Sequence, residues 1–439
     1  MKLKNHSPPI SPPPAQQRDA LRKGLGRALQ WALSGRLDHG LLLGACLQDQ
    51  RFDLQVESSR AEWLWQMIRA AGAMEPFRVP ILHALHDLSD EHSGSHLCEM
   101  ARLYAQAGDE AFRTRLYEIV EQKPFAHIPW LGEEEIMGLD GEQGFLFAAR
   151  VRGRLLAGRK WECDDDSLMH RAIECFGIER ARGVLDEFPD EAINRFRENW
   201  QRGQNVPKGG GIQAHQDRMA AIPIEEALRA AKGADRCFWL RGWGRCAKET
   251  DLQIVLQRLC TEREPRVIVN LLNVFAARGL PNIDPRLIEL CRHDDENVRQ
   301  RAFGALQQNS HQLVREVAMT ELHKGIREGG VVALFIKNYR QGDEHRILEA
   351  MELPEEECEL HWLLMDVIKV LEKNREADCS RLGVICYALT PCETCRFDAA
   401  RLLFNQQVAP KWLAEECRYD SGEDCRHLVQ KAAGSTEAK

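Results

Sequence analysis

The sequence has no run of about 18 uncharged apolar residues, which is what a membrane-spanning helix requires. Its first residues, MKLKNHSPPISPPPAQQRD, lack the apolar core of a signal peptide, so we expect a cytoplasmic protein. Runs of β-branched residues are few, while Leu, Ala, Arg and Glu dominate the composition. Because these residues favour helices over strands, we expect an all-α fold.

The chain also lacks a basic excess. It has 67 acidic and 59 basic residues, a formal net charge of -8, which weighs against a general nucleic-acid-binding protein. No Ser-His-Asp elbow, His-Glu-x-x-His motif, Walker loop or dinucleotide fingerprint is present. We therefore expect neither enzymatic activity nor a cofactor. The 15 cysteines are an odd number spread over 439 residues, which is typical of reduced thiols and not of a secreted disulfide framework.

Composition divides the chain into five parts. Residues 1–18 are rich in proline, which blocks helix and sheet hydrogen bonds, and are expected to be a disordered arm. Amphipathic helices fill residues 19–202. Three consecutive glycines mark a linker at 203–221; no Lys-Ser/Thr follows and no strand precedes them, so a phosphate-binding loop is disfavoured. A repeat domain is expected at 222–434 and a short tail at 435–439.

The repeat domain is predicted from apolar anchors that recur every 30 to 33 residues. The anchors are Val267, Val298, Val331, Leu363, Cys395 and Cys425. Each begins a helix whose next inward residue follows four positions later, namely Leu271, Ala302, Phe335, Val367, Ala399 and Val429. A shorter helix precedes each one. Because one helix pair cannot bury its apolar stripe alone, neighbouring pairs are expected to stack.

The stretch DDENVRQRAFGAL is similar to the second helix of a HEAT repeat, where acidic residues precede Val-Arg and then small and apolar residues. Residues Asp295, Val298, Arg299, Ala302 and Leu306 carry this resemblance. It is clearest at 283–306, 379–403 and 408–433. The resemblance implies an α-solenoid of stacked antiparallel helix pairs. The N-terminal block is then either a diverged continuation of the array or a separate helical cap.

The same resemblance implies a ladder of arginines and aspartates along the stack. The arginines would be Arg299, Arg396 and Arg426, with Asp295 and Asp420 as candidate partners. Solenoids of this kind typically bind proteins or extended peptides on their concave face. We therefore expect a non-catalytic scaffold or adaptor for a protein partner.

Two segments are candidate surfaces for that partner. Arg150 and Arg154 share a helical face and could hold an acidic group, although such charge runs are usually solvated and the acidic run 164–166 follows closely. Trp239 and Trp243 lie four residues apart. Such a pair packs in the core or, if exposed, forms a binding hot spot.

The stretch TPCETCR contains a Cys-x-x-Cys pair, Cys392 and Cys395. Cys395 takes an anchor position, so its default role is that of a small apolar core residue. Thr390 and Pro391 resemble the start of a helix, which would place Cys392 in the first turn and favour its thiolate. Structural, zinc and redox roles all stay open, and the nearest further metal ligands are Cys379 and Cys386.

The histidine-rich stretch HALHDLSDEHSGSH is a weaker metal candidate. His83 and His86 lie three residues apart, and His92 and His96 lie four apart. Polar residues also collect in ordinary solvated loops, and this spacing matches no closed ligand set. Two alternatives to the scaffold hypothesis therefore stand. One is a nucleic-acid-binding protein that resembles the HEAT-like DNA glycosylases and needs a basic stripe; the other is a metal or thiol-redox protein using Cys392 and Cys395.

Overall fold

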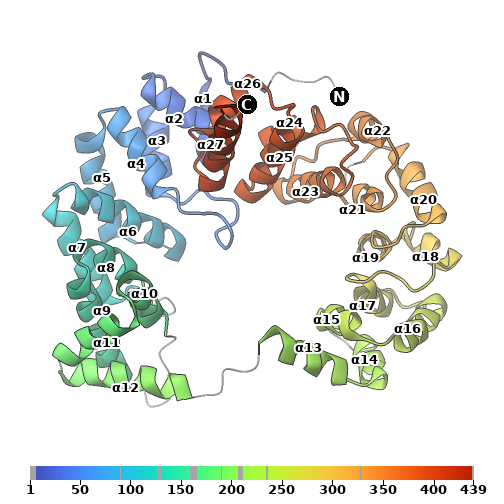
Figure 1. Ribbon diagram of the computed structural model, residues 1–439, viewed down its shortest axis with the longest axis horizontal. Coiled ribbons are helices and arrows are strands. Elements are labelled where there is room, and N and C mark those ends of the chain that lie inside the picture. The colour runs from blue at the N-terminus through green and yellow to red at the C-terminus, as the bar shows by residue number, and fades with distance from the viewer. Residues whose placement is uncertain are drawn as a thin grey trace. The chain divides into compact units, whose positions relative to one another are not determined.

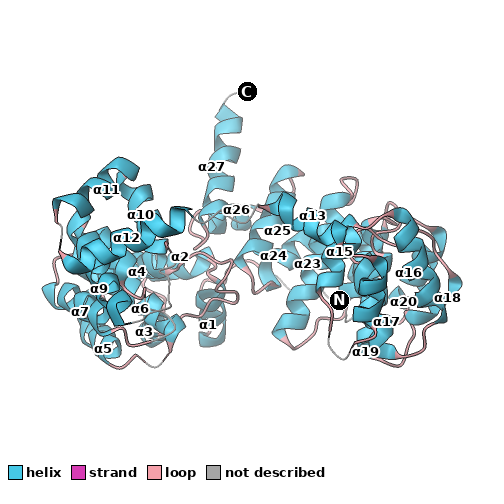
Figure 2. Cartoon of the chain, turned by 90° about the horizontal axis from the view of Figure 1, so that it is seen from below, coloured by secondary structure: helices cyan, strands magenta, loops and turns pink. Residues whose placement is uncertain are grey.

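The computed structural model describes residues 6–88, 90–125, 130–158, 166–188, 190–205, 211–233, 236–326 and 329–437. Within these ranges the chain is helical, with no strand and a single isolated β-bridge between Ile326 and Met351 (Figure 2). The prediction of an all-α protein is confirmed. No described helix is both long enough and apolar enough to span a bilayer.

The chain divides into two compact units. The N-terminal unit comprises Pro8–Lys208 and Glu415–Arg426, and the C-terminal unit comprises Met1–Ser7, Gly209–Ala414 and His427–Lys439. The boundary after Lys208 falls within the predicted linker. Much of that linker is nevertheless helical, since α13 spans Ile212–Ala221. The expected disordered arm is likewise wrong in part, because α1 begins at Pro14, where a proline suits the first helical position.

In the N-terminal unit, successive helices alternate between two rows. Its helices are α1 (Pro14–Lys23), α2 (Gly26–Leu33), α3 (His39–Leu47), α4 (Ala61–Ala70), α5 (Met74–His86), α6 (Glu91–Gln106), α7 (Glu110–Gln122), α8 (Glu133–Asp140), α9 (Glu142–Gly158), α10 (Ser167–Phe176), α11 (Ile178–Glu187) and α12 (Glu191–Asn205). Helices α1, α3, α5, α7 and α9 contact one another in order, as do α2, α4, α6 and α8. This unit therefore also consists of helices in two rows.

The C-terminal unit follows the same pattern (Figure 1). Its helices are α13, α14 (Ile224–Ala231), α15 (Trp239–Cys246), α16 (Glu249–Thr261), α17 (Pro265–Phe275), α18 (Pro285–Leu290), α19 (Glu296–Leu306), α20 (Gln312–Leu322), α21 (Gly329–Ala333) with η1 (Leu334–Ile336), α22 (Asp343–Ala350), α23 (Glu357–Lys373), α24 (Leu382–Leu389) and α25 (Glu393–Asn405). The chain ends with α26 (Lys411–Cys417) and α27 (Glu423–Glu437). Helices α15, α17, α19, α21, α23 and α25 form one row, each in contact with the next; we call it the second-helix row.

The predicted anchors lie in the core. The six anchors and the six residues that follow them at four positions are all buried, as is Leu306. Shorter helices pack beside this row, since α16 contacts α17, α18 contacts α19 and α20 contacts α21. The apolar period read from the sequence therefore marks buried residues, and five of the six pairs lie in the second-helix row.

Amide side chains join successive helix pairs near the ends of the second helices. Asn309 accepts a hydrogen bond from the Leu280 amide (2.9 Å) and donates one to the Leu280 carbonyl (2.8 Å). Asn338 accepts from the His311 amide and donates to the Asn309 carbonyl, both at 2.9 Å. Gln406 accepts from Cys379 and donates to Ala377 in the same way. Each amide satisfies backbone groups of an adjacent loop, which would otherwise lose these hydrogen-bond partners.

The predicted ladder of arginines and aspartates takes a different form. Arg299 donates to the carbonyl oxygens of His293 and Asp294, six and five residues before it, and Arg426 repeats this contact with Asp420 and Ser421. These arginines fix the loop before their own helix, and Asp295 instead caps α19 through the Val298 amide. Arg396 is fully buried.

An ion pair does join neighbouring helix pairs, at residues that the alignment of the repeats did not indicate. Arg315 on α20 forms a bidentate ion pair with Asp343 at the start of α22, with distances of 2.6 and 3.0 Å. Arg315 lies in the shorter-helix row, so an alignment of second helices could not reveal it.

Candidate functional site

A groove of about 610 Å³ crosses the second-helix row of the C-terminal unit. Its lining comes from α15, α19, α21 and α23, and we call it the second-helix groove. Gly304, Gly330 and Ala333 line its middle, so that no large side chain from these positions fills it. Side chains able to bind a partner lie toward its ends.

One end of the groove is basic. Arg301 and Arg241 line it, and Arg236 lies close enough that its charge acts on Arg301. Burial lowers the pKa of Arg301, and the charges of Arg236 and Arg241 lower it further. The Arg301 guanidinium lies 5.8 Å from the ring centre of Phe238, which is 59% exposed. Within the described chain, none of these three arginines forms an ion pair with a carboxylate.

The other end of the groove is formed by α23. Trp362 is 59% exposed there, beside Met365 and Asp366. Burial raises the pKa of Asp366, and the Lys369 ammonium, 3.0 Å from its carboxylate, opposes that shift. This end therefore offers an exposed aromatic surface beside the paired Asp366 and Lys369.

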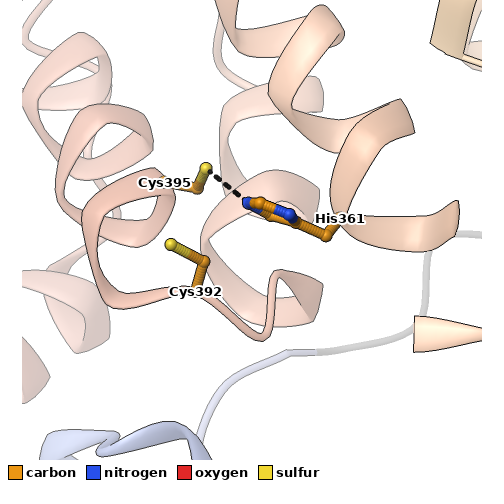
Figure 3. Close-up of side chains that lie close together, drawn as sticks. All are labelled: His361, Cys392 and Cys395. Atoms are coloured by element: carbon orange, nitrogen blue, oxygen red, sulfur yellow. Dashed lines mark hydrogen bonds between the residues drawn. The ribbon is translucent and has the colours of Figure 1, made fainter. Parts of the chain in front are cut away.

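A second cluster joins two neighbouring helix pairs. The Sγ atom of Cys395 lies 3.3 Å from Nε2 of His361, and the ligand atoms of His361, Cys392 and Cys395 all lie within 4.8 Å of one another (Figure 3). His361 comes from α23, whereas the cysteines lie at the start of α25. Cys392 is 3% exposed and Cys395 7%, while His361 is half-buried. Potential metal ligands are His, Cys, Asp and Glu side chains. Among the residues that the structure describes, this is the only group of three or more of them that is compact enough to hold a metal ion.

The local backbone places both sulfurs on one side. Cys392 is the N-cap residue of α25, in an extended conformation, and Cys395 is the third helical residue. The helix therefore starts two residues later than the sequence suggested. The reason is that the Thr390 hydroxyl accepts a hydrogen bond from the Cys392 amide (3.4 Å), forming a turn before the helix.

The two thiols differ in electrostatic environment. A hydrogen bond with Cys395 lowers the pKa of Cys392; burial opposes this shift, and His361 adds to it. The pKa of Cys395 is raised by the same hydrogen bond, by burial and by the charge of Cys392. The thiolate is thus concentrated on Cys392, which also stands at a helix N-terminus.

The other predicted metal ligands do not join this cluster. Cys386 is buried and its Sγ lies 3.9 Å from the Leu364 carbonyl, and Cys379 is buried beside Gln406. His83 and His86 on α5 are exposed, and neither belongs to a compact group of ligands within the described residues. His96, from the same stretch, is buried with its Nε2 3.1 Å from the Ala45 carbonyl.

Three of the four predicted partner-binding residues are engaged within their own units. Arg150 pairs with Asp190 at 2.5 Å, and Arg154 pairs with Glu121 at 2.8 Å. Trp243 is buried, and its Nε1 donates to the Ile222 carbonyl at 2.9 Å, whereas Trp239 is partly exposed. Trp243 therefore packs in the core. In the acidic run after Arg154, residues 164 and 165 lie outside the described residues.

The N-terminal unit contains an acidic pocket of about 410 Å³ lined by residues of α6, α8, α9 and α10. Burial raises the pKa of Glu135 to about 8 and that of Glu99 to about 7. The charge of Glu99 raises the pKa of Glu135 further, and the charge of Glu134 raises the pKa of both. Glu133 is neutralised by Lys123 (2.5 Å) and Arg152 (2.6 Å). The pocket therefore holds two half-buried carboxyl groups, Glu99 and Glu135, that ionise reluctantly.

No model of a known protein family matches this chain, and no curated protein matches it either. The function is therefore inferred from the residues of these sites.

Proposed function

We propose that the protein is a non-catalytic scaffold whose C-terminal unit is a HEAT-like α-solenoid. In this proposal the second-helix groove binds an extended, acidic segment of a partner protein. The observation that carries the proposal is the half-buried Arg301, which lies with Arg241 at one end of the groove without a carboxylate partner in the described chain.

The order of helix contacts supports the solenoid. Second helices contact their neighbours in sequence, and shorter helices pack against them, which is how a stack of helix pairs buries its apolar stripes. In Figure 1 the second-helix row lies on the inner side of the curve made by the C-terminal unit. The similar alternation from α1 to α9 supports extending the proposal to the N-terminal unit, as a diverged part of the array.

The chemistry of the groove favours an acidic peptide. Clustered arginines repel one another and are costly to desolvate, so a carboxylate that accepts two parallel hydrogen bonds from Arg301 would relieve both penalties. Phe238 and Trp362 offer apolar contact area at the two ends. Arginine and aromatic residues are also the types that dominate protein-binding hot spots.

Nucleic acid fits the groove less well. A phosphate backbone needs basic side chains along its whole path, because each phosphate carries a charge. Glu296, Glu359 and Asp366 line the same groove, and the unpaired arginines gather at one end. The proposal therefore commits to a protein segment, and nucleic acid is treated as a competing outcome.

The test is selection of binders from a random peptide library with the purified full-length protein. We expect enriched sequences to combine Asp or Glu with an apolar residue. The double variant Arg241→Glu/Arg301→Glu should weaken their binding at least tenfold, because reversing charges at a desolvated ion pair costs about 2–5 kcal/mol. Arg229→Glu is the matched control, since Arg229 is exposed on α14 and does not line the groove.

Three results would oppose the proposal. One is enrichment of peptides without acidic residues, and another is binding of acidic peptides to the double variant as tightly as to the unaltered protein. Tighter binding of oligonucleotides than of any peptide, with affinity falling steeply as salt rises, would instead support the nucleic-acid alternative.

A further inference from the structure

We propose that His361, Cys392 and Cys395 form a binding site for a zinc ion that links two neighbouring helix pairs. The inference is independent of the scaffold proposal, because none of these three residues lines the second-helix groove.

The three ligand atoms lie at distances that suit a zinc ion. Zinc binds sulfur at about 2.3 Å and imidazole nitrogen at about 2.0–2.1 Å, so a sulfur and a nitrogen that share a tetrahedral zinc lie about 3.6 Å apart. The Sγ of Cys395 and the Nε2 of His361 are 3.3 Å apart, and all three ligand atoms lie within 4.8 Å of one another. Displacements of less than about 1 Å, which rotation of these side chains can supply, complete the ligand geometry.

The types of ligand also favour zinc. Two thiolates and an imidazole are soft and borderline donors, which suit zinc and not magnesium or calcium. Zinc binding would release the proton of each thiol and retain a neutral imidazole, so the ion and its ligands would have no net charge. An uncharged centre suits a site where both sulfurs are buried.

The repeat pattern accounts for the residue type at only one of these three positions. Cys395 occupies an anchor position that is held by Val298 three repeats earlier, so packing alone accounts for it. Cys392, three residues before that anchor, corresponds to Asp295 and Gly422 in other repeats. His361, two residues before the anchor Leu363, corresponds to Glu296 and Glu423. Only this pair of neighbouring repeats combines His and Cys at the two positions.

Three protein ligands leave one tetrahedral position, which a water molecule would occupy. Structural zinc sites usually have four protein ligands, and sites with three are typically open to an exogenous group. Asp398 lies one turn beyond Cys395 and pairs with Arg401 at 2.8 Å, so its carboxylate is already engaged. The site would therefore connect α23 to α25 and keep one exchangeable coordination position.

The test begins with full-length protein, fully reduced and freed of metal, dialysed against Zn²⁺ and analysed for bound metal. We expect one zinc per chain. Loading with Co²⁺ should give the thiolate charge-transfer band and the visible bands of a tetrahedral site. His361→Gln and Cys392→Ser should each weaken zinc binding more than about hundredfold, since loss of even an outer-shell partner costs 10–100-fold.

Cys358→Ser is the matched control. Cys358 is an exposed thiol one turn before His361 on α23, and its loss should leave affinity and stoichiometry unchanged. Helix content measured by circular dichroism shows whether each variant is folded. If Cys392→Ser fails to fold, His361→Gln and the Co²⁺ spectrum of the unaltered protein still decide the question.

Two results would overturn the proposal. One is the absence of stoichiometric metal on the reduced protein, whether or not mild oxidation then joins Cys392 and Cys395 in a disulfide. The other is unchanged zinc binding in folded His361→Gln protein.

Discussion

The Nε2 atom of His361 lies 3.3 Å from the Sγ atom of Cys395, although the two residues are 34 positions apart in the chain. Each stands at the beginning of a second helix, one in α23 and the other in α25. Stacking of these helices brings residues near the anchors of neighbouring repeats together. The contact shows how a repeated fold assembles a polar site from residues that are unremarkable within a single repeat.

Zinc should stabilise the folded protein through this cluster. At a free zinc concentration of 100 times Kd, binding to the folded state alone adds about 2.7 kcal/mol to the free energy of unfolding. Thermal unfolding of reduced protein should therefore shift upward when zinc is added. The shift should disappear in His361→Gln and persist in Cys358→Ser; an equal shift in all three proteins would place the metal elsewhere.

Substitutions at Gly304 test whether the second-helix groove is the site of peptide binding. A Cβ atom at this position of α19 meets no atom within 4 Å, so Gly304→Ala should raise the free energy of unfolding by about 0.5–1 kcal/mol through helix propensity. Gly304→Phe should fill the groove and abolish binding of acidic peptides while leaving helix content unchanged. Retained peptide binding in a folded Gly304→Phe variant would show that peptides bind at another surface.

Unlike Gly304, Gly244 has no room for a Cβ atom. A Cβ at this position would lie 1.9 Å from the Val274 carbonyl oxygen, because α15 and α17 pack closely there. Gly244→Ala should therefore lower the melting temperature, in contrast to Gly304→Ala. Equal changes in stability for Gly244→Ala and Gly304→Ala would contradict the close packing of α15 against α17.

Asn338 tests the amide links between helix pairs. Replacing it with alanine leaves the His311 amide and the Asn309 carbonyl without their partner. An unsatisfied buried polar group costs about 1–3 kcal/mol, so urea unfolding of Asn338→Ala should show a loss of at least that size. The control Asn282→Ala removes an exposed amide and should change stability by less than about 0.5 kcal/mol.

Glu135 should make stability depend on pH. Burial raises its pKa to about 8 in the folded protein, above the value of about 4.3 that applies after unfolding. Below the unfolded pKa the carboxyl is protonated in both states; as pH rises toward 8, only the unfolded state readily loses the proton. The free energy of unfolding should therefore fall from pH 4.5 to 8, by up to about 1.4 kcal/mol per pH unit for one proton.

The matched variant is Glu135→Gln, which keeps the shape of the side chain and cannot ionise. Denaturant unfolding at several pH values should show a shallower decline in the variant and greater stability than the unaltered protein at pH 8. Glu99, whose pKa is raised to about 7, should account for part of the remaining slope. Parallel pH profiles of variant and unaltered protein would contradict the assignment to Glu135.

The sequence predicts the helical class and the buried anchors, because both follow from apolar residues that recur at fixed intervals. It does not predict that Arg299 binds its own loop, since a guanidinium reaches either a neighbouring carboxylate or local carbonyls and the sequence does not distinguish them. The helix over Ile212–Ala221 was missed because the glycines before it dominate the local pattern.

His361 was also missed, although a signal was available. It stands two residues before the anchor Leu363, and Cys392 stands three residues before the next anchor, so the register alone places them near each other. A search limited to ligands close in the chain led instead to Cys379 and Cys386. The groove could not be foreseen at all, because it depends on which side of each second helix faces away from the core.

The most direct test of the account is X-ray absorption at the zinc edge of the reduced, zinc-loaded full-length protein. The proposed site predicts two sulfur atoms at about 2.3 Å, one imidazole nitrogen at about 2.0–2.1 Å and one further light atom. A first shell made only of nitrogen and oxygen, or a sulfur shell unchanged in Cys392→Ser, would contradict it.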